Sequence, residues 1–96
     1  MMDLSPQSVD IIKKIMQEYV PGCEVRVFGS RVNSTAKKYS DLDLVIVGKE
    51  KIPTRKMNAL REAFEDSDLP IRVDVLDWHA ISSDFRVIIE KRFEVL

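Results

Sequence analysis

Residues 25–47 read VRVFGSRVNSTAKKYSDLDLVIV: a short apolar strand ending at Gly29-Ser30, a polar connection, and a second strand that opens with Asp41 and Asp43. Side chains alternate along a strand, so the two acids share one face and the apolar residues between and after them occupy the other. Two neighbouring carboxylates repel each other unless a cation or a shared proton lies between them. The stretch therefore indicates a site built on paired acids.

Length and composition limit what this site belongs to. Ninety-six residues with 45% hydrophobic content predict a single domain, residues 1–96, with one core. A net charge of -1, from 15 basic and 16 acidic residues, gives no general surface for a polyanion, so nucleic acid is not the default partner. One cysteine, no signal-like apolar run and no membrane-length segment together lead us to expect a cytoplasmic protein.

Hydrophobic periodicity and capping residues predict a mixed α/β order, α-β-α-β-α-β-α, in an α+β fold. Because a long connection doubles back between the first two strands, we expect them to be antiparallel, whereas a helical crossover favours parallel pairing of the second and third. The expected sheet is small, mixed and three-stranded, and is covered by helices. The expected elements are a helix from Ser5-Pro6 to Pro21-Gly22, a strand at 24–28, a short turn from Ser30, a strand at 42–47, a helix from a Thr54 cap through Asp66, a strand at 71–76 and a last helix from Ser82 or Ser83 to Leu96.

A third acid completes the cluster. In the strand at 71–76, Asp74 alternates with the apolar Val73 and Val75, and in the expected sheet it lies beside Asp41 and Asp43 on the same face. Three carboxylates on one face repel one another unless a cation or a shared proton lies among them.

Gly29-Ser30, ten intervening residues and Asp41-Leu42-Asp43 form the pattern G-S-x10-D-x-D. On this pattern, and on the third acid, the chain resembles a minimal nucleotidyltransferase domain of the DNA polymerase β superfamily, of the kind paired with HEPN proteins. The resemblance covers nearly the whole chain and implies the nucleotidyltransferase fold.

The resemblance also implies an activity and its residues. Asp41, Asp43 and Asp74 would be catalytic and would bind one or two Mg²⁺ ions, with Asp74 accepting the proton of the attacking hydroxyl. The residues Gly29, Ser30 and Arg31 would bind the nucleotide phosphates. The implied reaction moves a nucleoside monophosphate, AMP from ATP, to a hydroxyl acceptor, a tyrosine of a helical HEPN-type toxin, so that the chain acts as the antitoxin.

One departure from the family keeps an alternative open. Many members continue after G-S-R with a small residue, a basic residue and glycine, whereas Val32-Asn33-Ser34 follows here. The alternative is a catalytically weak or inactive module that keeps the fold and neutralises its partner by occlusion. The last helix is expected to carry Val87 and Val95 in addition to its apolar stripe, and this extra apolar surface suggests a homo-oligomer or a partner-helix contact.

Other chemistry-bearing residues have simpler readings. We interpret His79 as a structural or surface residue. We interpret Cys23 as a small packing residue, since no His or Lys that could activate its thiol is evident near it. Asp74 alone could pair with Arg72 or Arg26. The loop cations Lys37 and Lys38 are as consistent with a solvated loop as with a phosphate clamp. The basic group Lys49, Lys51, Arg55 and Lys56 is interpreted as a solvated face, about 20 Å along the strand from the acids.

Overall fold

The computed structural model describes residues 4–32 and 41–96. Its elements follow the order α1 (Pro6–Tyr19), β1 (Glu24–Phe28), the 3-10 turn η1 (Gly29–Arg31), β2 (Leu42–Val47), α2 (Thr54–Glu65), β3 (Val73–Asp77), the 3-10 turn η2 (Trp78–Ala80), α3 (Ser83–Lys91) and β4 (Glu94–Val95). The expected mixed α+β class is confirmed. So is the order of elements as far as α3.

The strands form one mixed sheet in the order β3-β2-β1-β4. As expected, β1 and β2 are antiparallel, with Phe28 opposite Asp43, and β2 and β3 are parallel, with Asp43 opposite Asp74. Strand β2 lies inside the sheet, between β3 and β1. The prediction of three strands was wrong, because β4 adds a fourth, antiparallel to β1.

The end of the chain was predicted as helix and is extended instead. Helix α3 ends at Lys91, Arg92 has extended backbone angles, and the backbone N–H of Leu96 donates to the Val25 carbonyl at 2.9 Å. The apolar spacing of the last residues imitates a helical stripe. Pairing with the otherwise open edge of β1 satisfies backbone groups that a longer helix would leave unpaired.

Two other boundaries differ from their predictions. Helix α2 is capped by Pro53, whose carbonyl accepts the Met57 N–H at 3.0 Å, so Thr54 is the first helical residue and not the cap. Strand β3 starts at Val73, two residues later than predicted, because β2 itself begins at Leu42, the residue paired with Val73. The first helix, by contrast, begins as predicted, with the Ser5 hydroxyl accepting the Ser8 N–H at 3.2 Å.

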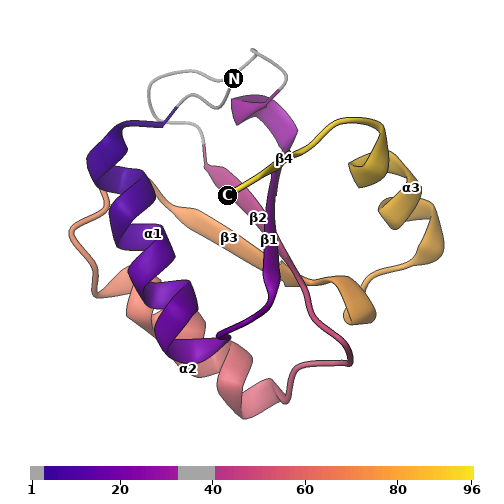
Figure 1. Cartoon of the computed structure of the whole chain (residues 1–96), viewed down its shortest axis with the longest axis horizontal. Helices are drawn as coiled ribbons and strands as arrows, with labels where there is room; N and C mark the ends of the chain where they lie inside the picture. The colour runs from indigo at the N-terminus through magenta and orange to yellow at the C-terminus, as the bar shows by residue number, and fades with distance from the viewer. Residues whose placement is uncertain (1–3, 33–40) are drawn as a thin grey trace.

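Helices α1 and α2 cover one face of the sheet, and α3 covers part of the other. On one face, apolar side chains of the strands pack against α1 and α2, which lie side by side in Figure 1, and Leu42, Leu44 and Ile46 of β2 are all fully buried there. Each such side chain contributes about 1.5–3 kcal/mol by leaving water. On the other face, a smaller cluster of Phe28, Val45 and Ile89 joins the sheet to α3. No helix in the described part of the chain is long and apolar enough to cross a membrane.

Candidate active site

The second face of the sheet carries the three acids. Asp41 immediately precedes β2 and Asp43 lies within it, so alternation directs both to the face opposite the Leu42–Leu44 core. Asp74 is the register partner of Asp43 across the parallel β2–β3 ladder, and paired residues on adjacent strands lie about 5 Å apart on the same face. The geometry therefore places the three predicted acids together, Asp41 and Asp74 exposed and Asp43 half-buried.

The carboxylate of Asp43 sits against the backbone of Gly29. Gly29 has φ +79°, in the left-handed region that glycine adopts without strain, and a β-carbon added to it would lie 3.2 Å from the Asp43 Cγ and closer still to its Oδ2. Because Gly29 has no side chain, the end of β1 and the Asp43 carboxylate of β2 can approach each other.

Asp43 is harder to ionise than a free aspartate because it is half-buried and lies near Asp74 and Asp41. The pKa of Asp43 is raised above its ordinary value of 3.8, first by burial, then by the negative charge of Asp74 and then by that of Asp41. A group of carboxylates with this mutual repulsion is stabilised by a cation.

The donor set suits Mg²⁺ in chemistry, since all three groups are hard carboxylate oxygens. In the described residues, however, no three Asp, Glu, His or Cys side chains are already gathered tightly enough to hold a metal ion. Mg²⁺ does not need such a cluster, because proteins usually bind it through one or two carboxylates together with water and substrate phosphates. The acids fit an ion that arrives with a nucleotide rather than a closed, protein-only cage.

The predicted phosphate-binding residues lie in the turn η1. The Val32 N–H donates to the Gly29 carbonyl at 3.1 Å and closes this turn, which contains Ser30, whose side chain lies outside the described structure. Arg31 is buried, with 7% of its surface exposed, so little of its side chain is accessible for the predicted phosphate contact. Lys37, Lys38 and most of the family departure after Val32 fall outside the described residues.

The simpler interpretations of His79 and of the basic group are confirmed, whereas the ion pair considered for Asp74 is not found among the described residues. The His79 ring nitrogen Nε2 lies 2.6 Å from the Gly48 carbonyl oxygen and donates to it, which fixes the ring in a structural hydrogen bond. Lys49, Lys51, Arg55 and Lys56 are all exposed. In the described structure Asp74 has no ion pair with Arg72 or Arg26; the guanidinium of Arg26 pairs with Glu24.

Sequence reasoning missed one buried acid with a clear structural role. Asp77, at the end of β3, is 5% exposed; its Oδ2 accepts the Ile52 N–H at 2.8 Å and its Oδ1 accepts the His79 N–H at 3.0 Å. It holds the loop before α2 onto the end of β3. The signal was its position, since an acid at a strand end followed by a turn commonly caps the backbone two residues on.

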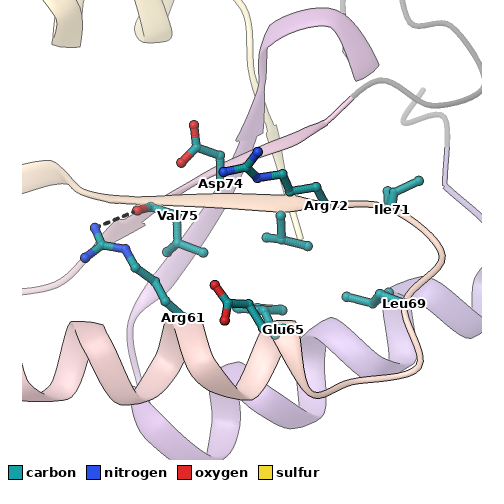
Figure 2. A pocket seen from close by; sticks show the side chains of 9 residues that line it. Arg61, Glu65, Leu69, Ile71, Arg72, Asp74 and Val75 are labelled. Atoms are coloured by element: carbon teal, nitrogen blue, oxygen red, sulfur yellow. Dashed lines mark hydrogen bonds between the residues drawn. The ribbon is translucent and has the colours of Figure 1, made fainter.

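A pocket of about 300 Å³ runs along the free edge of β3, and Asp74 is among its lining residues, whereas Asp41 and Asp43 are not. Figure 2 shows that Arg61 and Glu65 reach into it from α2, whereas Arg72 and Asp74 project from the opposite side of the strand. Arg61 donates to the Val75 carbonyl at 3.1 Å, which protects the exposed edge of the sheet. The acids are therefore reached from the other face of β3.

Comparison with known proteins places this geometry in a family. The family described as "Nucleotidyltransferase domain" matches residues 9–96. A Haemophilus influenzae protein named "Probable protein adenylyltransferase MntA" is 48% identical over 95 residues, which cover 99% of this chain and 83% of that protein.

Two solved structures share the fold. One, described as a toxin–antitoxin with AMP-PNP, has a TM-score of 0.76 at 20% identity and covers 90% of this chain and 69% of its own. The other, a mutant of the toxin–antitoxin MntA-HpeT with a tyrosine changed to alanine, has a TM-score of 0.72 at 19% identity and covers 98% of this chain and 72% of its own. With the family match and the close relative, these findings confirm the minimal nucleotidyltransferase identified from the G-S-x10-D-x-D pattern: the chain belongs to the nucleotidyltransferase domain family and is an enzyme of that family.

Proposed function

We propose that this chain transfers AMP from ATP to a hydroxyl group of a protein acceptor, in a reaction that requires Mg²⁺. The observation that carries the proposal is the shared face of Asp41, Asp43 and Asp74, with the side-chain-free Gly29 against Asp43. The name of the 48% identical relative, a probable protein adenylyltransferase, supports a protein as the acceptor.

The acceptor we propose is a tyrosine of a HEPN-type helical toxin encoded nearby, so that the chain is its antitoxin. This rests on the family resemblance and on the solved relatives, which are described as toxin–antitoxin assemblies, one with AMP-PNP and one with a tyrosine replaced. AMP-PNP is an analogue of ATP, which supports ATP as the donor.

In the proposed reaction the acceptor oxygen attacks the α-phosphorus of ATP. A new oxygen–phosphorus bond forms, the bond between the α-phosphorus and the bridging oxygen breaks, and pyrophosphate leaves with that electron pair. Asp74, the exposed partner of Asp43 across the ladder, takes the proton of the hydroxyl. Bound Mg²⁺, which the acids would hold together with water and the substrate phosphates, would neutralise phosphate charge.

The chain's own residues do two further jobs. The left-handed turn at Gly29 lets the Asp43 carboxylate lie against the start of η1, and the backbone N–H groups of this turn are the donors that we propose for a phosphate. The half-buried position of Asp43 keeps one carboxylate fixed in the sheet while the other two stay exposed to substrate.

The test is incubation with labelled ATP, Mg²⁺ and the protein encoded beside this chain. We expect label on the neighbour, and a loss of at least about a hundredfold in rate for Asp41→Asn, Asp43→Asn and Asp74→Asn. Asp66→Asn changes an exposed acid that follows α2; it is the matched control for the exposed Asp41 and Asp74 and should transfer at the wild-type rate.

The competing candidate is a binding module that silences its partner by occlusion. It is favoured by the burial of Arg31, which leaves one predicted phosphate ligand largely covered. If the neighbour is bound and silenced while no label is transferred, and the three Asn variants silence it equally well, occlusion is the function and transfer is not.

A further inference from the structure

An apolar pocket adjoins the acid site on the side of α3. Its volume is about 410 Å³; its floor is Phe28 and Gly29, and its wall is formed by Phe85, Ile88 and Ile89 of α3. The rings of Phe28 and Phe85 meet edge to face with centroids 5.8 Å apart, so the floor and the wall are packed together and the hollow is a fixed feature of the fold.

The helix beside this pocket exposes large apolar side chains. Ile88 is 61% exposed and Val87 is 55% exposed, in neighbouring positions on the outer side of α3. Exposed apolar residues that adjoin an apolar hollow mark an interaction surface more often than scattered single ones do.

The rim of the pocket is cationic. Lys91 and Arg92, at the end of α3, line it and are exposed. The acids of α3, Asp84 and Glu90, are exposed but are not among its lining residues. A ligand that fills the pocket therefore meets apolar carbon at the bottom and positive charge at the mouth.

Gly29 connects the pocket to the catalytic acids. It forms part of the pocket floor and is also the residue against which the Asp43 carboxylate rests. Whatever occupies the pocket is therefore held within one residue of the proposed site of transfer.

We propose that this pocket and the outer side of α3 dock the acceptor protein through an acidic segment with an aromatic or large aliphatic anchor. The anchor fills the hollow beside Phe28 and Phe85, and flanking carboxylates meet Lys91 and Arg92. The docked segment presents the neighbouring hydroxyl to the acids. That the docked segment belongs to the acceptor protein rests on the proposed function. That the segment is acidic and carries an apolar anchor rests on the lining of the pocket alone.

The adenine base of ATP is the other candidate occupant, and the lining argues against it. Recognition of adenine uses groups that hydrogen-bond its amino group and ring nitrogens. The lining side chains in the described structure are phenylalanine, isoleucine, lysine and arginine, none of which can accept a hydrogen bond from an amino group, so adenine would have to rely on backbone carbonyls alone.

The test is binding to the whole chain of two synthetic peptides, each with one phenylalanine, flanked by glutamates in the first and by lysines in the second. We expect the glutamate peptide to bind at least tenfold more tightly, with amide shifts in α3 and at Gly29 in NMR spectra. The double variant Lys91→Glu with Arg92→Glu should reverse this preference, and Ile88→Glu should weaken binding of the glutamate peptide at least tenfold.

Val95→Glu is the matched control, because Val95 is 53% exposed but lines a different pocket, against the end of α1. It should bind the peptides as the wild type does, and ATP affinity should be unchanged in every variant. Peptides that bind equally, or not at all, overturn the proposal. Loss of ATP affinity in Ile88→Glu or in the double charge variant also overturns it, because the pocket then belongs to the nucleotide.

Failure of this inference is distinguishable from failure of the proposed function. If the peptides bind as expected but no label reaches the neighbouring protein, the transfer reaction is wrong and the docking surface stands. If label transfer requires the three acids but Ile88→Glu transfers at the wild-type rate, the reaction stands and the docking surface is wrong.

Discussion

Replacing Gly29 by alanine tests the contact on which the site is built. Two glycines of this chain have nearly the same left-handed backbone, Gly22 at φ +81° and Gly29 at φ +79°, but only Gly29 has a neighbour where a β-carbon would go. A left-handed backbone costs a non-glycine residue about 1–2 kcal/mol, and this cost is common to Gly22→Ala and Gly29→Ala.

The second cost falls on Gly29 alone. Its added methyl would lie 3.2 Å from the Asp43 Cγ and nearer still to Oδ2, so the carboxylate has to move. Overpacking of this kind typically costs about 1–3 kcal/mol. We therefore expect a loss of about 2–5 kcal/mol in the free energy of unfolding for Gly29→Ala, against about 1–2 kcal/mol for Gly22→Ala.

The assay is urea unfolding of both variants in wild-type and Asp43→Ala backgrounds. With alanine at position 43 only its β-carbon is left, 3.5 Å from the new methyl, which is ordinary contact. The cost of Gly29→Ala should then fall to that of Gly22→Ala, a coupling of about 1–3 kcal/mol. Equal costs for the two glycines in the wild-type background, or no coupling to Asp43, would refute the reasoning.

Three further predictions concern Asp43, Asp77 and the cation–π contacts of Arg26. Asp43→Asn should unfold at a higher urea concentration than wild type at pH 7 without Mg²⁺, because the raised pKa of Asp43 means that its ionised form destabilises the fold. This gain should shrink as the pH falls through the folded pKa and disappear below 3.8, where the carboxyl is protonated in both the folded and the unfolded chain. Asp77→Ala should cost about 2–4 kcal/mol in urea unfolding, since two backbone N–H donors lose a buried acceptor; a cost below about 0.5 kcal/mol would contradict this. Arg26→Ala should cost about 1–2 kcal/mol, because its guanidinium lies 5.0 Å from the ring centroid of Trp78 and 4.3 Å from that of Phe93, and Arg26→Lys should recover only part of the loss in thermal melts.

Most of the sheet could be predicted because its strands follow local patterns. The alternation in β1 and the continuous apolar run in β2 have few other interpretations, and the turn at Gly29 needs a residue that tolerates a positive φ. The shared face of the acids followed from strand alternation and from parallel pairing of β2 with β3, and both are as expected.

The parts that were not predicted depend on contacts between residues distant in sequence. The β4 strand exists because β1 has an open edge, and nothing in residues 92–96 themselves distinguishes it from the end of a helix. Asp77 is buried because a loop from another part of the chain, at Ile52, needs an acceptor. The pocket under α3 depends on how the helix rests on Phe28, which no periodicity encodes.

The most direct test of the central claim compares two aspartates of the same strand. Asp74 lies on the acid face, whereas Asp77 is buried in structural hydrogen bonds, and the substitution Asp→Asn is the same at both. The measurement is the intact mass of the neighbouring protein after reaction with ATP and Mg²⁺, at equal concentrations of folded enzyme. We predict the added mass of AMP with wild type and Asp77→Asn and none with Asp74→Asn; equal modification by both variants would contradict the account.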